Sequence, residues 1–116
     1  MRVFASVAVA LSLITTAGCS RGAADAQKSA THTVVMDGTR FQPDDLTVNV
    51  GDSIVWINKD PFPHTATSEA GGFDSDEIES GQSWTFEASK AGEFPYICTL
   101  HRTMKGMLRV KERNGG

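Results

Sequence analysis

Three residues with side chains that bind soft metal ions follow one another at a spacing of three in the C-terminal part of the chain. These are Cys98, His101 and Met104, and a second histidine, His64, lies far upstream. Thiolate and thioether ligands favour Cu(I), and imidazole binds both oxidation states of copper. Two histidines, one cysteine and a weak methionine ligand are the composition of a blue-copper electron-transfer centre. The four residues therefore predict a copper site.

Each of these residues has an ordinary structural role when it stands alone. A single cysteine is often a small buried apolar residue, and a methionine often fills space in a core. The shared spacing favours a common ion, because one tight turn can wrap ligands at i, i+3 and i+6 around it. His64 must then come from a second loop at the same end of the fold. Zinc is the alternative ion, although a thioether ligand suits it poorly.

The first residues of the chain have the pattern of a secretory signal. A basic residue precedes a mostly apolar run over 3–14, and small residues follow that run. The run is too short for a transmembrane helix, which needs about 20 apolar residues. The sequence TAGC at 16–19 resembles a bacterial lipobox, so we expect an export signal over 1–18 and lipidation of Cys19. Ordinary cleavage after Ala26 is the alternative.

A flexible tether and one small domain are expected after the signal. Residues 19–30 are rich in Ala, Ser and Gly without periodicity, which predicts the tether. The domain is expected over 31–112, with a short tail at 113–116. Exported domains usually pair their cysteines in disulfides, but Cys98 has no partner once Cys19 is lipidated or removed. Metal ligation supplies a reason for that unpaired cysteine, and a bound metal would stabilise so small a domain.

Short alternating runs of β-branched and aromatic residues, separated by Gly and Asp turns, make up the domain. This pattern predicts an all-β fold, a Greek-key antiparallel β-sandwich of seven to eight strands. Pro95 lies in the strand that leads to Cys98, so that strand must lie at an edge or leave the proline without a partner. Strands or extended segments are predicted at 33–36, 46–50, 53–58, 64–68, 83–87, 94–98 and 107–111.

Two sequence motifs surround the candidate ligands. One is N-x-D-x-x-P-H-T at 58–65, and the other is G-E-F-x-Y-x-C-x-x-H-x-x-M-x-G at 92–106. The run F-x-P-x-x-L-x-V-x-x-G-D-x-I-x-W-x-N at 41–58 precedes them. Together they resemble the small blue-copper cupredoxins of the plastocyanin and amicyanin kind. The C-x-x-H-x-x-M spacing is similar to the short ligand loop of amicyanin-like members, since plastocyanin and pseudoazurin place the methionine two residues further on.

This resemblance implies a periplasmic one-electron carrier whose single type 1 copper cycles between Cu(I) and Cu(II). It implies that Cys98 supplies the thiolate and that His64 and His101 complete the trigonal plane. Met104 would be the weak axial ligand that tunes the potential. Met107 is the rival axial candidate, and it is disfavoured because alternation in the last strand would point it outward.

The resemblance also implies a docking surface for redox partner proteins. In the family, the edge of the histidine equivalent to His101 lies near solvent inside an apolar ring, for which Phe62, Pro63, Leu100 and Met107 are candidates here. Ordinary packing of the loops is the alternative explanation of these apolar residues. Two positions depart from the family pattern. Thr65 replaces an Asn whose side chain often ties the two ligand loops together, and Leu100 replaces a proline found in many relatives.

The charge of the chain bears on its partners. The full sequence has 11 basic and 14 acidic residues, and residues 31–112 have 7 and 13, a formal charge of −6. Nucleic acid is excluded as a partner because no basic face is expected. An acidic run over 69–79 favours a solvated loop, with steering of a basic partner as the alternative. Arg102 and Lys105 beside the candidate site leave the sign of the docking surface open. We expect a monomer.

Three interpretations of function remain at this point. The first is the electron carrier, which is not an enzyme, because the sequence has no second metal site, nucleophile–base pair or substrate domain. The second is a module for copper delivery or sequestration, although His32, Met36 and Met107 are the only additional soft ligands after the signal. The third is a structural domain that has lost copper, and the complete ligand set argues against it.

Overall fold

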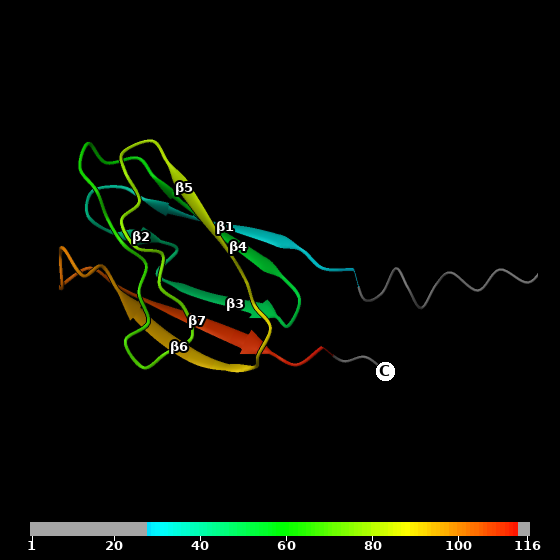
Figure 1. Cartoon of the computed structure of the whole chain (residues 1–116). Helices are drawn as coiled ribbons and strands as arrows, with labels where there is room; N and C mark the ends of the chain where they lie inside the picture. The colour runs from blue at the N-terminus through cyan, green and yellow to red at the C-terminus, as the bar shows by residue number, and fades with distance from the viewer. Residues whose placement is uncertain (1–27, 114–116) are drawn as a thin grey trace, which may run out of the picture.

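The computed structural model describes residues 28–113 as a sandwich of two β-sheets with no helix (Figure 1). One sheet has the strand order β2-β1-β4-β5 and the other has the order β3-β7-β6. This confirms the predicted all-β sandwich. The strands are β1 (Thr31–Met36), β2 (Phe41–Gln42), β3 (Asp45–Asn49), β4 (Ser53–Asn58), β5 (Ser83–Glu87), β6 (Gly92–Ile97) and β7 (Lys105–Lys111).

Some of the predictions for the ends of the chain lie outside the described residues. These are the export signal over 1–18, lipidation of Cys19, the part of the tether up to residue 27, and the tail at 114–116. Across the described residues, the structure contains no helix with the length and apolar character needed to cross a membrane.

The sheets are mixed, whereas the sequence analysis expected antiparallel pairing throughout. β1 pairs with β4 in parallel, and β3 pairs with β7 in parallel, while the other three ladders are antiparallel. Parallel partners need a long connection between them, and here each of these connections passes through a strand of the other sheet. The alternation of side chains reports which face of a strand is buried but not the direction of its neighbour, so the sequence pattern did not contain this feature.

The core lies between the sheets and is centred on β4. Ser53–Asn58 alternates half-buried and buried positions, and its inward side chains Ile54 and Trp56 are fully buried. The Trp56 ring lies 5.4–5.6 Å from the rings of Phe73, Trp84 and Tyr96. Burial of each large apolar side chain contributes about 1.5–3 kcal/mol. This core gives the loops at the ends of the sandwich a fixed base.

The loops that carry the candidate ligands meet at one end of the sandwich, and the described chain ends lie at the other (Figure 1). The ligand end is formed by loops 37–40, 59–82 and 98–104, which follow β1, β4 and β6. β1 begins and β7 ends at the opposite end.

Two strand predictions have informative outcomes at the ligand end. The segment over 64–68 is extended and is held by isolated bridges, such as that between Thr67 and Ile97, so no strand forms there. β6 lies at the edge of its sheet, as Pro95 required. β2 was not predicted, because its two residues are too short for alternation to be recognised.

The end of the sandwich opposite the ligands is joined by one buried carboxylate, that of Asp52. It accepts hydrogen bonds from the Ala30 and Asn49 amides at 2.9 and 3.0 Å. It also pairs with His32 Nε2 at 3.0 Å and with the Arg113 guanidinium at 2.8 Å. Asp52 therefore connects the beginning of β1, the end of β3 and the segment after β7.

Candidate metal centre

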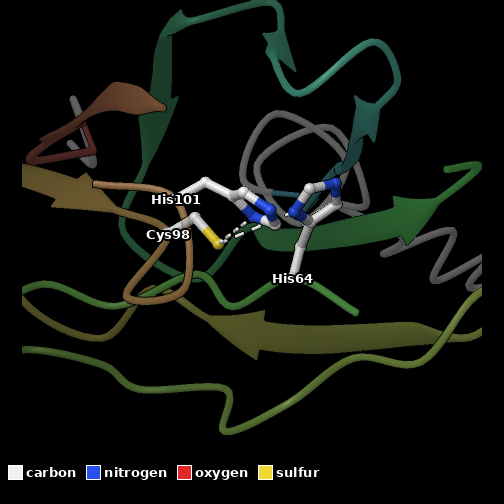
Figure 2. A group of neighbouring side chains, drawn as sticks. All are labelled: His64, Cys98 and His101. Atoms are coloured by element: carbon white, nitrogen blue, oxygen red, sulfur yellow. Dashed lines mark hydrogen bonds between the residues drawn. The ribbon is translucent and has the colours of Figure 1, made fainter. Parts of the chain in front are cut away.

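The structure brings His64, Cys98 and His101 together, as predicted. Their donor atoms all lie within 4.8 Å of one another. Cys98 Sγ is 3.6 Å from His64 Nδ1 and 3.7 Å from His101 Nδ1. Figure 2 shows the three side chains pointing toward one another. His64 and Cys98 are fully buried, whereas His101 is half-buried and reaches the surface.

The turn between β6 and β7 places the C-terminal ligands. The His101 amide donates to the Cys98 carbonyl at 3.3 Å, and the Met104 amide donates to the His101 carbonyl at 2.9 Å. The Cys98 amide then donates to the Met104 carbonyl at 3.0 Å, which closes the loop. Met104 is 2% exposed and belongs to this closed loop. Met107 is half-buried in β7, and strand alternation points it away from the face of its buried neighbour Leu108.

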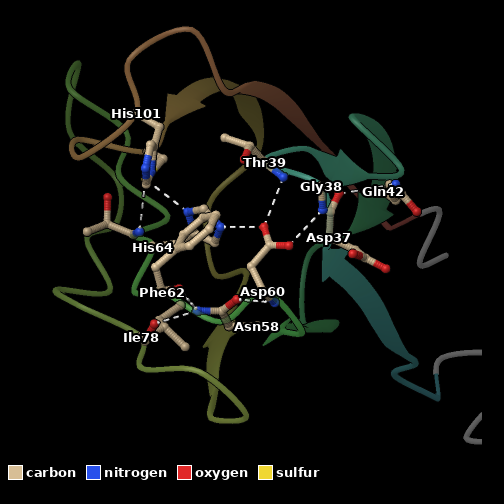
Figure 3. A network of polar contacts seen from close by, with 12 residues as sticks. Asp37, Gly38, Thr39, Gln42, Asn58, Asp60, Phe62, His64, Ile78 and His101 are labelled. Carbon is tan, nitrogen blue, oxygen red and sulfur yellow. Dashed lines mark hydrogen bonds and ion pairs between the residues drawn. The ribbon is translucent and has the colours of Figure 1, made fainter.

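A buried carboxylate, Asp60, lies behind the first histidine (Figure 3). Its Oδ2 is 2.7 Å from His64 Nε2, and its two oxygens accept the Gly38 and Thr39 amides at 2.8 and 2.9 Å. Because an ionised carboxylate only accepts hydrogen bonds, Nε2 carries the proton of the imidazole. The lone pair of Nδ1 is then free to face Cys98. In metal sites, a histidine commonly donates from its free ring nitrogen to a carboxylate in this way, and the hydrogen bond fixes the orientation of the ring.

Asp60 is an anion in this environment. Burial raises the pKa of its carboxyl, but the hydrogen bonds from His64 and from the Thr39 and Gly38 amides outweigh burial and hold the pKa below its ordinary value. Sequence reasoning noted Asp60 within a motif but gave it no role. The contact depends on loop 37–40, which is distant in sequence, and no local spacing reports it.

The loop that faces Asp60 stores backbone strain. Gly38 and Thr39 both have positive φ angles, +64° and +58°, which point both amides at the carboxylate. This conformation is costly for a β-branched residue such as Thr39, on the order of 1–3 kcal/mol.

Asn58 supports the other side of the site: its Nδ2 donates to the Phe62 carbonyl, and its Oδ1 accepts the Asp60 amide (Figure 3).

Two threonines tie the two ligand loops together. The Thr65 amide donates to Cys98 Sγ at 3.3 Å, and the Thr65 hydroxyl oxygen accepts the Thr99 amide at 2.9 Å. The hydroxyls of Thr65 and Thr99 are also 3.1 Å apart. The departure from the family pattern at Thr65 therefore leaves the cross-loop link in place, with a hydroxyl where the family often has an amide side chain.

An exposed apolar surface lies over the site. Among the described residues, the exposed large apolar side chains are Phe62 (39%) and Leu100 (46%). The Phe62 ring is 5.2 Å from the His64 ring and 5.3 Å from the His101 ring. Leu100 precedes His101 in the loop. We call these two exposed side chains, the one 5.3 Å from the His101 ring and the other next to His101 in the chain, the apolar patch.

The donor set suits copper. A buried thiolate and two imidazoles can hold either of its oxidation states, and the amide directed at Cys98 Sγ stabilises the negative sulfur. The ligands come from two loops that are hydrogen-bonded to each other and to a rigid sandwich. Little in this arrangement must move when the charge of a bound copper ion changes by one.

Comparisons with known proteins agree with this site. The profile of the Cupredoxin-like domain family matches residues 4–110. Amicyanin-alpha of Methylorubrum extorquens is 28% identical over 119 residues, which cover 96% of this chain and 100% of that protein. The structure of an oxidized amicyanin mutant superposes with a TM-score of 0.65 at 26% identity, covering 69% of this chain and 81% of the other.

A copper enzyme contains a similar domain. A Cu-containing nitrite reductase from Thermus scotoductus SA-01 superposes with a TM-score of 0.67 at 31% identity, covering 72% of this chain. The match covers 23% of the nitrite reductase chain, so this protein corresponds to about a quarter of that enzyme.

Proposed function

This chain belongs to the cupredoxin-like domain family, whose cofactor is a type 1 copper, and on that premise we propose that it is a periplasmic one-electron carrier. Its one copper would cycle between Cu(I) and Cu(II) without catalysing a reaction of its own. One observation carries the proposal: the buried Cys98 Sγ lies 3.6–3.7 Å from Nδ1 of both histidines in a scaffold-held cluster.

We assign four ligands. Cys98 would supply the thiolate, and His64 and His101 would complete the plane around the ion. Met104 would be the axial ligand, supported by its burial and by its place in the closed loop after Cys98. Bound copper supplies one-electron redox chemistry, and the role of the protein residues is to fix the ligands and exclude water.

Redox partners would dock on the apolar patch. His101 is the ligand that reaches the surface, the exposed Phe62 ring lies 5.3 Å from its ring, and the exposed Leu100 precedes it in the chain. A partner that covers the patch would bring its own redox centre close to this histidine. We propose that the protein acts as a monomer.

Export and membrane attachment form part of the proposal. The N-terminal sequence favours secretion and lipidation of Cys19. The described chain begins at the end of the sandwich opposite the ligands (Figure 1). A tether over 19–30 would therefore attach to the far end of the domain and leave the apolar patch free for partners.

The decisive experiment is a copper titration of the purified chain, followed by visible absorption and EPR spectroscopy. We expect an intense blue band that saturates at one copper per chain, with narrow copper hyperfine splitting. Cys98→Ser should abolish the band, whereas Cys19→Ser, which removes the other cysteine, should leave it unchanged. A blue band that persists in Cys98→Ser would contradict the ligand assignment.

Copper delivery is the alternative function. It predicts rapid transfer of copper to an acceptor and negligible electron self-exchange, whereas the carrier proposal predicts slow copper release and rapid exchange. The burial of Cys98 and His64 favours the carrier, because a delivery site needs ligands that an acceptor can reach.

The match to a nitrite reductase favours one class of electron acceptor. We propose that a copper-containing nitrite reductase is a partner to test first, since such a chain includes a domain 31% identical to this one. Reduced protein should be reoxidised by that enzyme in a nitrite-dependent manner. Reoxidation at the same rate without nitrite or enzyme would exclude this partner.

A further inference from the structure

A row of hydroxyl groups runs from the ligand loops to the surface. Thr65 Oγ1 accepts the Thr99 amide at 2.9 Å, and the Thr67 hydroxyl lies 3.0 Å from Thr65 Oγ1. The same Thr67 hydroxyl lies 3.0 Å from Asp74 Oδ1. Thr65 and Thr67 are buried, and Asp74 is exposed. We call Thr99, Thr65, Thr67 and Asp74 the threonine row.

Two acceptors in the threonine row, Thr65 Oγ1 and Asp74 Oδ1, compete for the hydrogen of the Thr67 hydroxyl. Thr67 is the donor to both Thr65 and Asp74, but a hydroxyl has a single hydrogen. An ionised carboxylate is the stronger acceptor, so this hydrogen is drawn toward Asp74. Thr65 Oγ1 then accepts from the Thr99 amide without sharing its acceptor capacity with the Thr67 hydroxyl. Without the carboxylate, the hydrogen would turn to Thr65 Oγ1, whose two lone pairs would then serve both the Thr67 hydroxyl and the Thr99 amide. Sharing one acceptor weakens the bond from the Thr99 amide without breaking it.

Thr65 carries this effect to the metal-binding sulfur. Its hydroxyl holds the Thr99 amide, while its own amide donates to Cys98 Sγ at 3.3 Å. A looser link to Thr99 would let the loops separate and would lengthen the bond from the Thr65 amide to the sulfur. Hydrogen bonds to the cysteine sulfur are one of the determinants of the potential of a blue-copper site.

From this geometry we propose that Asp74 is a positioning residue for the ligand loops and acts through Thr67 and Thr65. It is not a ligand and lies in the exposed loop before β5. The effect on the copper rests on the proposed function, whereas the effect on the loops does not require copper. Asp74 thereby couples an exposed carboxylate to the thiolate environment.

The direction in which the reduction potential changes distinguishes a positioning role of Asp74 from a simple effect of its charge. Removal of a negative charge near the site destabilises Cu(II) relative to Cu(I), so the charge effect of Asp74→Ala alone would raise the potential. A weaker hydrogen bond to the thiolate favours Cu(II), so loss of positioning would lower it. Glu77→Ala is the matched control, because Glu77 is an exposed acid of the same loop and forms no side-chain hydrogen bond in the described structure.

The test measures backbone amide exchange at Thr99 and Thr65 in the apo protein and the reduction potential in the copper protein. We expect Asp74→Ala to speed exchange at Thr99 by roughly twofold to fivefold, as for the weakening of one hydrogen bond, and to lower the potential. Glu77→Ala should leave exchange unchanged and raise the potential slightly. Asp74→Asn, which keeps an acceptor oxygen, should retain most of the protection at Thr99.

A double-mutant cycle shows whether Asp74 acts through Thr67. In a Thr67→Val background, Asp74→Ala should change neither exchange at Thr99 nor the potential beyond the Glu77→Ala control. An effect of Asp74→Ala that persists at full size without the Thr67 hydroxyl would overturn the proposal. The same conclusion would follow if Asp74→Ala behaved like Glu77→Ala. A wild-type protein without a blue band would refute the proposed function, while the apo exchange data would still decide the role of Asp74.

Discussion

At the scale of single residues, the buried Asp60 carboxylate is the hydrogen-bond partner of His64. Asp60→Asn removes the anion that lies 2.7 Å from His64 Nε2. That anion stabilises the extra positive charge of Cu(II), so we expect a higher reduction potential, measurable by voltammetry. Urea unfolding of the apo variant should show a loss of about 1.5–3 kcal/mol, as for a hydrogen bond to a buried charge.

Asp37→Asn provides the control for this prediction. Asp37 is an exposed carboxylate next to Gly38, so its removal changes the net charge by the same amount near the same loop. We expect a small shift in potential and little loss of stability. Equal shifts in the two variants would show that long-range charge, and not the contact with His64, determines the effect.

The grouping of His64, Cys98 and His101 was predicted from the sequence, whereas the contacts that support these side chains were not. Cys98, His101 and Met104 lie within one turn, so their spacing reports their proximity directly. Asp60 meets Gly38 and the Thr65 hydroxyl meets Thr99 only because separate loops are packed together. Contacts of this kind depend on the whole fold, and one sequence contains no local pattern for them.

At the scale of elements, Asp52 joins strands that are distant in sequence. Burial raises the pKa of its carboxyl, but the Ala30 and Asn49 amides, His32 and Arg113 outweigh burial and lower it from 3.8 to about 2. A depressed folded-state pKa means that the stabilisation is complete above about pH 4 and is lost as the pH falls toward 2. The free energy of unfolding should therefore fall across this window.

The variant Asp52→Asn isolates that contribution. At neutral pH we expect it to lose about 1.5–3 kcal/mol of unfolding free energy, because buried donors lose a charged acceptor. Between pH 4 and 2, its stability should fall less steeply than that of the wild type in urea titrations. Asp45→Asn is the control, since Asp45 pairs with Arg109 at the surface, where ion pairs contribute little. Parallel pH profiles for wild type and Asp52→Asn would contradict the assignment.

The accuracy of the strand predictions increases with the length of the alternating pattern in each strand. The prediction for β4 coincides with Ser53–Asn58, because its alternation of buried and half-buried positions extends over six residues. β2 has two residues and no recognisable period. The parallel ladder between β1 and β4 could not be inferred from alternation, which is the same for either strand direction.

At the scale of the whole molecule, the two ends of the sandwich have different tasks. The loops that carry the candidate ligands and the apolar patch lie at one end, and the described chain ends lie at the other (Figure 1). Asp52 pairs with Arg113 close to the end of the described chain. Electron exchange between two copies should therefore require contact between their ligand ends. A charged substitution at that end should slow exchange, whereas one that adds the same charge at the far end should not.

Leu100→Glu and Ser89→Glu form the matched pair for this test. Both positions are exposed, and both substitutions add one negative charge, but Leu100 flanks His101 while Ser89 lies between β5 and β6 at the far end. In Leu100→Glu, each copy would place a carboxylate where apolar surface is buried on contact, which costs desolvation and repulsion between like charges. We expect electron self-exchange, measured by NMR line broadening in mixed oxidation states, to slow by about tenfold or more. High salt should restore only the part of the self-exchange rate that is lost to charge repulsion, because salt does not screen the desolvation cost. Equal slowing in Ser89→Glu would mean that net charge, and not the apolar patch, governs the encounter.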